Sequence, residues 1–162
     1  MSLGIWVPSD FVLVDTNYWY ALLDCKQERH TEAVRMIAES SAPLATTNYI
    51  INELVECINE QNLSIDVVYF FWDLWTGNIA RVIRITPECE MLAWKLYLQV
   101  QNTELSFTDC TSLVLLAKFA MANFLTFDES LAMFFDQQRH ALAKWLQAIV
   151  ADRPPGHVSA EK

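Results

Sequence analysis

The chain has 162 residues, which suits one domain with a sizeable core, and 53% of them are hydrophobic. No run of about 18 residues lacks charged and strongly polar side chains, and no basic segment precedes an apolar one at the start. We therefore expect no membrane span, no signal peptide and a cytoplasmic location. The net charge of −9 argues against a general nucleic-acid-binding protein, because phosphate contacts need a basic surface. It does not exclude a nuclease, because bound cations offset clustered carboxylates.

The lysines and arginines are scattered along the chain, and we interpret them as solvated helix faces rather than RNA contacts. They include Lys26, Arg29, Arg35, Arg81, Arg84, Lys118 and Arg139. Four tryptophans in aromatic helices have few basic neighbours, so we interpret them as core or dimer interface rather than base-stacking platforms. These are Trp72, Trp75, Trp94 and Trp145.

The cysteines form no Cys-x-x-Cys pair and all lie in apolar segments. They are Cys25, Cys57, Cys89 and Cys110. This spacing favours buried free thiols over disulfides or a zinc site. The three histidines likewise show no paired spacing that is typical of a zinc enzyme.

The first elements predicted along the chain are one buried strand and two helices. Phe11–Val14 is a continuous apolar run that ends at Asp15, as expected of a strand buried on both faces. Thr16 or Asn17 can cap the helix that follows. After a polar turn, residues 31–37 continue as a second helix with one apolar face.

The middle of the chain begins with a short strand candidate, Leu44–Thr46. Thr47 or Asn48 caps the next helix, which we expect to end near Gln61. Ser64 caps a further helix, and a Thr-Gly turn stops it.

The next predicted elements are a strand and two helices. Ile79–Ile85 alternates enough between apolar and polar residues to be a strand. Pro87 starts a helix that runs to about Gln101, at the position where a missing N–H costs nothing. Ser106 and Asp109 have the spacing of a capping box and start the next helix.

The last clear strand is Phe124–Phe127, and the residues after Asp128 follow a helical pattern to about Val150. Residues 153–162 contain prolines and a glycine and are predicted to be a disordered tail. Strands that alternate with helices indicate an α/β fold with a parallel sheet.

Four acids are candidates for one site at the carboxyl ends of the strands, where functional groups of parallel sheets gather. Asp15 and Asp128 lie at or directly after strand ends, and Glu53 and Asp109 lie near helix starts that can face the same edge. Carboxylates repel one another, and Mg²⁺ or Mn²⁺ would offset this repulsion and activate water. Glu56 shares roughly the helical face of Glu53 and is an alternative ligand.

Each acid also has a purely structural interpretation. Asp109 can complete the capping box, and Asp15 and Asp128 can cap the helices that follow them. Glu53 can face solvent.

Four motifs, in this order, resemble those of the PIN domain family, most closely the VapC-type ribonuclease toxins of bacterial toxin–antitoxin pairs. The motifs are Val14–Asn17, Thr46–Asn48 followed by Glu53, Leu105–Asp109 and Leu125–Asp128. The resemblance implies one PIN-like domain over residues 1–152, with a central parallel sheet of four or five strands flanked by helices. The family usually has a short final strand after the position of Asp128, where this sequence reads as helix.

The resemblance also implies a metal-dependent endoribonuclease that holds Mg²⁺ or Mn²⁺. Its implied metal ligands are Asp15, Glu53, Asp109 and Asp128, and its implied site rim includes Asn17, Thr47 and Thr126. Members of the family often form homodimers and are held inactive by a small antitoxin, so both are expected partners alongside RNA.

Two other functions are weighed against the nuclease. The acidic surface and the apolar excess also fit a non-catalytic PIN-like module that binds a protein or RNA partner. A haloacid-dehalogenase-type phosphatase is a weaker alternative, because that chemistry needs a second Asp two residues after the first, and Asn17 occupies this position.

Overall fold

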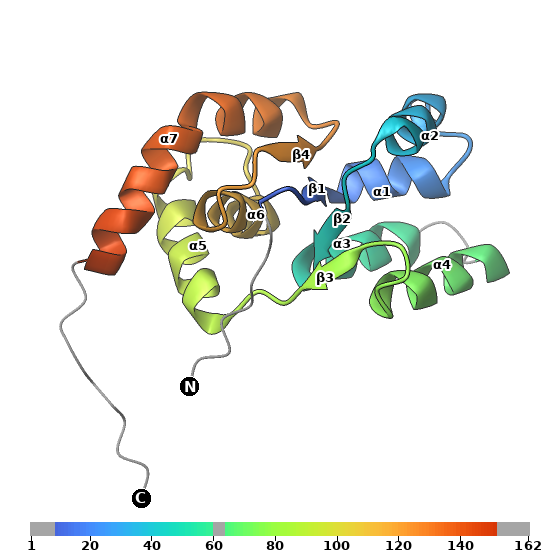
Figure 1. The fold of residues 1–162 in the computed structure, drawn as a ribbon, viewed down its shortest axis with the longest axis horizontal. Helices are drawn as coiled ribbons and strands as arrows, with labels where there is room; N and C mark the ends of the chain where they lie inside the picture. Colours follow the sequence, from blue (N-terminus) through green and yellow to red (C-terminus); the bar gives the residue numbers. More distant parts are fainter. Residues whose placement is uncertain (1–8, 60–63, 152–162) are drawn as a thin grey trace, which may run out of the picture.

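The computed structural model describes residues 9–59 and 64–151 and arranges them as parallel strands flanked by helices (Figure 1). The elements are β1 (Val12–Val14), α1 (Thr16–Leu23), α2 (His30–Glu39), β2 (Leu44–Thr47), α3 (Asn48–Asn59), α4 (Ile65–Trp75), β3 (Arg81–Ile83), α5 (Pro87–Gln99), α6 (Phe107–Lys118), β4 (Asn123–Leu125) and α7 (Glu129–Ala151). The predicted tail, residues 153–162, and the predicted helix end at Gln61 lie outside the described residues. The predicted domain limits of 1–152 therefore stay a prediction.

The four strands of the described residues form one sheet in the order β3-β2-β1-β4, with every neighbouring pair parallel. The predicted α/β fold with a parallel sheet is therefore confirmed. Residues after Asp128 form α7 rather than a fifth strand, as their helical pattern predicted. All four strands lie within the predicted segments or extend them by one residue.

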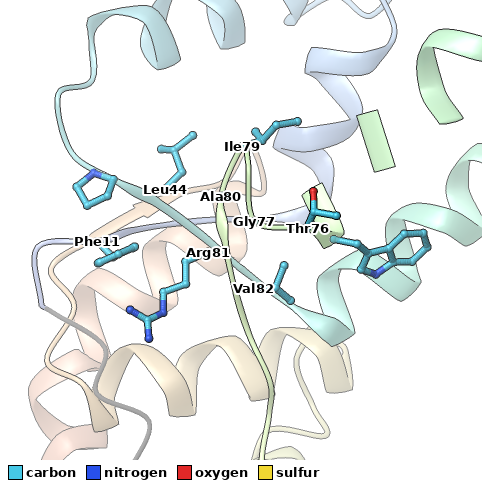
Figure 2. A pocket seen from close by; sticks show the side chains of 10 residues that line it. Phe11, Leu44, Thr76, Gly77, Ile79, Ala80, Arg81 and Val82 are labelled. Carbon is cyan, nitrogen blue, oxygen red and sulfur yellow. The ribbon is translucent and has the colours of Figure 1, made fainter. Parts of the chain in front are cut away.

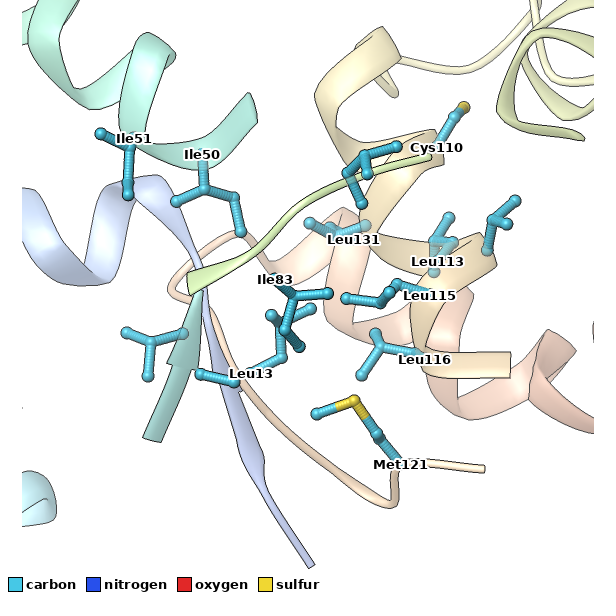
Figure 3. Packing of buried hydrophobic residues seen from close by; sticks show 14 of the residues in the cluster. Leu13, Ile50, Ile51, Ile83, Cys110, Leu113, Leu115, Leu116, Met121 and Leu131 are labelled. Atoms are coloured by element: carbon cyan, nitrogen blue, oxygen red, sulfur yellow. The ribbon is translucent and has the colours of Figure 1, made fainter. Parts of the chain in front are cut away.

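The core lies between the sheet and α6, which is buried along most of its length. Figure 3 shows Leu13 of β1 and Ile83 of β3 beside Leu115 and Leu116 of α6. Leu13 is 0% exposed and the other three are 1% exposed. Because burial of one such side chain contributes about 1.5–3 kcal/mol, this contact stabilises the packing of α6 against the sheet.

Helix caps account for several element boundaries. The Ser64 and Thr86 side chains accept hydrogen bonds from backbone N–H groups at the starts of α4 and α5. The prediction that Thr16 or Asn17 caps α1 is wrong, because Asp15 occupies the N-cap position without a side-chain capping bond. Both predicted caps instead direct their side chains to other segments.

The prediction that all four thiols are buried is wrong in part. All four cysteines are free, but Cys25 and Cys57 are exposed while Cys89 and Cys110 are buried. Of the tryptophans predicted to lie in the core or a dimer interface, Trp145 packs against the core, whereas Trp72, Trp75 and Trp94 are exposed, so for these three the dimer interface stays a prediction. Among the helices of the described residues, none is long and apolar enough to cross a membrane.

The carboxyl end of α6 contains a strained residue. The Met121 N–H donates to Leu116 O at 2.9 Å and the Ala120 N–H donates to Ala117 O at 3.4 Å, which is the Schellman pattern of helix ends. Ala120 has φ +51°, a left-handed conformation that glycine adopts without the steric cost of a Cβ.

We expect Ala120→Gly to raise the free energy of unfolding by about 0.5–1 kcal/mol, because relief of the left-handed strain exceeds the added freedom of the unfolded chain. Urea denaturation followed by circular dichroism measures this change. Ala143→Gly inside α7 is the matched control, and it should destabilise by about 1 kcal/mol. A loss of stability in Ala120→Gly would contradict the assignment.

Candidate functional site

The carboxyl end of the central strand β1 carries a buried acid. Asp15 follows Val14 directly and is 4% exposed. Its backbone N–H donates to Leu125 O at 2.9 Å, which ties it to the end of β4. The Thr126 hydroxyl donates to Asp15 Oδ2 at 2.8 Å. The neighbouring strand therefore fixes the orientation of this carboxylate.

All four predicted acids line one cavity at this edge of the sheet, with a volume of about 520 Å³. Its lining residues are Asp15, Thr16, Asn17, Tyr20, Glu53, Cys57, Glu104, Ser106, Asp109 and Asp128. The cavity thus collects acids from the end of β1, the middle of α3, the first turn of α6 and the residue before α7, elements that are far apart in sequence.

Burial and repulsion act together on Asp15. The pKa of Asp15 is raised to about 7, chiefly by burial and in smaller part by the nearby carboxylates of Asp109 and Glu53. The hydrogen bonds from the Thr126 hydroxyl and the Thr16 backbone act in the opposite direction. The charged form of Asp15 is therefore poorly stabilised by the protein alone.

Glu53 points into the same cavity from α3. The Thr16 hydroxyl donates to Glu53 Oε2 at 2.5 Å, which links α3 to the start of α1. Burial raises the pKa of Glu53, and Asp109 and Glu56 add to this effect. Glu56 is exposed and does not line the cavity, so of the two alternatives only Glu53 faces the other acids.

Asp109 has a structural role and a place in the cavity at once. Its Oδ2 accepts a hydrogen bond from the Ser106 N–H at 2.6 Å, and the Ser106 hydroxyl accepts one from the Asp109 N–H at 3.1 Å, so the capping box is present. Burial raises the pKa of Asp109, and Asp128 contributes to the same direction. The two interpretations of this acid are therefore compatible.

Asp128 has the same double character. Its Oδ1 accepts a hydrogen bond from the Leu131 N–H at 2.9 Å, which caps the start of α7. Its own N–H donates to the Thr126 hydroxyl at 3.0 Å. The residue is exposed, at the solvent side of the cavity.

The three predicted rim residues do not share one position. Asn17 lines the cavity, and its Oδ1 accepts from the Phe127 N–H at 2.9 Å. Thr126 contacts the Asp15 carboxylate and accepts from Asn17 Nδ2 at 3.2 Å. Thr47 does not line the cavity; it is fully buried, and its hydroxyl accepts from the Ile50 N–H at 3.1 Å.

Other lining residues were not among the sequence candidates. Thr16 supports Glu53, and Cys57 lies one turn after Glu53 on α3, so helical spacing could have found it. Glu104 adds a fifth carboxylate from the loop before α6, where no periodicity places a side chain. Tyr20 and Ser106 complete the lining.

The donor set suits a hard divalent cation, because carboxylate oxygens are the ligands that Mg²⁺ and Mn²⁺ prefer. No group of three or more histidine, cysteine or acid side chains among residues 9–59 and 64–151 is already drawn together tightly enough to enclose an ion. Repulsion nevertheless couples Asp15, Glu53, Asp109 and Asp128 in one cavity. An ion would offset this repulsion once the side chains rotate toward it.

A second cavity of about 520 Å³ lies at the opposite edge of the sheet (Figure 2). Phe11, Leu44 and Arg81 line it near the amino ends of the strands, together with Trp75 at the end of α4. Its lining contains no acid. Of these two cavities, only the one at the carboxyl edge of the sheet could bind a metal ion through carboxylates.

Comparison with known proteins places this arrangement in a family. The model of the PIN domain family matches residues 12–134, which is more than half of the chain. The chain is 26% identical over 117 residues to the 23S rRNA-specific endonuclease VapC20 of Mycobacterium tuberculosis strains CDC 1551 / Oshkosh and ATCC 25618 / H37Rv, covering 72% of this chain and 88% of the relative.

The crystal structure of Mycobacterium tuberculosis VapC20, described as a toxin that cleaves the sarcin–ricin loop, has a similar fold. The two structures superpose with a TM-score of 0.69 at 26% identity, over 75% of this chain and 93% of the other. The family match covers all four acids and all four strands of the described residues. The chain belongs to the PIN domain family.

Proposed function

We propose that the chain is a metal-dependent endoribonuclease that hydrolyses RNA phosphodiester bonds. One observation carries the proposal: four acids from separate elements, predicted in advance from family motifs, line a single cavity at the carboxyl edge of the sheet. The endonuclease activity printed for the VapC20 relatives supports it.

In this proposal Asp15, Glu53, Asp109 and Asp128 hold Mg²⁺ or Mn²⁺. When bound, the ion would activate water and neutralise charge on the phosphate. Thr126 and Thr16 hold the carboxylates of Asp15 and Glu53 in fixed orientations through their hydroxyl hydrogen bonds. Such supporting hydrogen bonds usually change metal affinity or activity by about 10–100-fold.

Water, rather than a protein side chain, is the proposed nucleophile. Burial raises the pKa of Cys110 to about 12, so its thiol stays protonated at neutral pH. The Ser106 hydroxyl accepts the capping bond of α6, and no described histidine lines the cavity to activate it.

The substrate that we propose to test first is a structured ribosomal RNA loop. The relatives are described as acting on 23S rRNA and on its sarcin–ricin loop. We propose a cytoplasmic location, where such a ribosomal RNA would be accessible.

We further propose two protein partners, a small basic antitoxin and a second copy of the chain. An acidic cavity and a net charge of −9 complement a basic partner segment. One face of α4 exposes large apolar side chains that would suit its apolar part, namely Ile65, Val68, Tyr69, Trp72 and Trp75. The exposed Met91, Trp94 and Leu98 of α5 form the surface proposed for pairing of two copies.

A non-catalytic binding module is the alternative function. It is favoured by the hydrogen bonds that already occupy one oxygen of each of the four acids. Metal affinity separates the two functions, since a folded module that binds no Mn²⁺ cannot be the proposed nuclease.

The first prediction from the proposed function is that Asp109→Asn lowers Mn²⁺-dependent cleavage by at least about 100-fold, because one charged ligand oxygen is lost. The Asn side-chain oxygen can still accept the Ser106 N–H, so the fold should persist. Cleavage of a sarcin–ricin hairpin and of a mixed RNA pool is measured with Mn²⁺ and with EDTA. Asp136→Asn, on the exposed side of α7, is the control of equal charge change. Equal activity in both variants would contradict the proposed site.

The second prediction concerns the stability of the metal-free protein. Asp15 has a pKa of about 7 in the folded state against its ordinary value of 3.8, so between these pH values the folded state holds a proton that the unfolded state has lost. Raising the pH through this window therefore lowers the free energy of unfolding, by on the order of 4 kcal/mol.

Thermal unfolding in EDTA and in Mn²⁺ between pH 4 and pH 8 tests this expectation. Asp15→Asn should remove most of the pH dependence in EDTA, and Mn²⁺ should stabilise the wild type more at pH 8 than at pH 5, because protons compete with the metal. The Asp136→Asn variant should behave like the wild type. If the stability of the wild type in EDTA does not change with pH, the pKa of Asp15 is not raised in the folded state.

A further inference from the structure

Arg29, at the start of α2, holds its guanidinium group against the segment that carries Asp128. The guanidinium carbon lies 4.1 Å from the centroid of the Phe127 ring. The Tyr18 ring stacks on the same ring, with centroids 4.6 Å apart and planes at 21°. Phe127 therefore contacts both Tyr18 and Arg29, and these three side chains form one stack.

This stack is anchored at its inner end. The Tyr18 hydroxyl donates to Ala33 O at 3.1 Å, and Tyr18 is 1% exposed. Arg29, at the outer end, keeps 43% of its side chain exposed. The stack therefore presents a cation to solvent on a rigid base.

Glu32 orients the guanidinium group without using all of its donors. Arg29 Nε and Nη2 donate to the two carboxylate oxygens of Glu32 at 2.8 and 3.0 Å. No acceptor within the described residues contacts Nη1 through a hydrogen bond. The Nη1–Nη2 edge is thus available for a second, bidentate acceptor, and a phosphate fits this fork.

The position of Arg29 is coupled to the acidic cavity through a short backbone segment. Phe127 lies between Thr126, which donates to Asp15, and Asp128, which lines the cavity. The Phe127 N–H donates to Asn17 Oδ1 at 2.9 Å, so the segment cannot shift without breaking contacts of the site. Arg29 therefore contacts a residue whose backbone is fixed by the site and which directly precedes the cavity residue Asp128.

We infer that Arg29 binds a backbone phosphate of the RNA substrate beside the scissile one, with Glu32 and Phe127 as its positioning residues. The inference rests on the proposed ribonuclease function. Arg29 would supply a positive charge that attracts RNA to an acidic site. The chain has 20 acidic and 11 basic residues and therefore no general positive surface. Binding of RNA, a polyanion, then depends on individual basic side chains at suitable positions.

The competing explanation is an ordinary surface ion pair. Arg29 and Glu32 are three residues apart at a helix start, and exposed pairs of this kind contribute little to stability. That explanation predicts no effect of Arg29 on RNA binding, and the two explanations therefore differ in a measurable quantity.

The experiment measures binding of a fluorescently labelled sarcin–ricin hairpin to the full chain carrying Asp109→Asn, which should not cleave it. Fluorescence anisotropy over a series of salt concentrations gives the slope of log affinity against log salt. Adding Arg29→Ala should reduce the magnitude of this slope by about 0.7–0.9, the value for one phosphate contact, and weaken binding about tenfold at low salt.

Two further variants distinguish a contact from a change in overall charge. Arg29→Lys should keep the slope but bind more weakly than Arg29, because lysine keeps the charge and loses the bidentate fork. Arg139→Ala, an exposed position on α7, changes the charge equally and should leave the slope unchanged. Thermal unfolding of each variant checks that the fold is retained.

RNA binding with an unchanged slope in Arg29→Ala would overturn the inference and leave the nuclease proposal standing. Equal slope changes in Arg29→Ala and Arg139→Ala would also overturn it, since the effect would then be general electrostatics. Absence of RNA binding in the Asp109→Asn background, together with no Mn²⁺-dependent cleavage of the hairpin or of the RNA pool by the wild type, would overturn this inference together with the ribonuclease proposal.

Discussion

The burial of one carboxylate at the end of the central strand is the constraint on which the site depends. Asp15 is 4% exposed and lies at the end of an apolar strand, where its charged form loses most of its hydration. Two other carboxylates, Asp109 and Glu53, raise its pKa further. The packing of β1 against the core supplies the stability that keeps this unfavourable group in place, and a cation is the simplest means of relieving it.

The site reuses hydrogen bonds that also build the fold. The capping bond of Asp109 starts α6, and the capping bond of Asp128 starts α7, while both residues line the cavity. A carboxylate has two oxygens, so one can satisfy a helix end while the other remains available to a ligand. This arrangement sets each acid in place through local backbone structure, and it explains why sequence alone left capping and metal binding as open alternatives.

The order of strands and helices followed from the sequence because the apolar runs and caps are local signals. Phe11–Val14 and Phe124–Phe127 were recognisable as strands, and α6 was recognisable from its capping box. The choice between Glu53 and Glu56 needed the structure, because two residues on one broad helix face differ only in what they meet across space.

Exposure was the property that the sequence predicted least well. Trp72 was predicted to lie in the core or a dimer interface, and in the structure both it and Tyr69 on the same face of α4 are more than 60% exposed. An apolar helix face gives the same sequence periodicity whether it packs against the chain's own core or against a partner protein. Periodicity therefore does not distinguish a buried face from an exposed one. Thr47 was predicted on the rim of the site but is buried at the end of β2. Glu104 was not predicted, because its place in the cavity depends on the path of the loop before α6.

The acidic charge of the chain has a consequence for how it would select RNA. Most non-specific affinity for RNA comes from cations released when basic side chains neutralise phosphates, and a chain of net charge −9 gains little of it. Affinity must then come from a bound metal, from shape and from a few fixed contacts such as the one inferred for Arg29. Because each of these depends on local geometry, an RNA that does not fit the cavity gains no compensating attraction elsewhere. Weak general attraction therefore favours a nuclease of narrow specificity over one that degrades RNA at large.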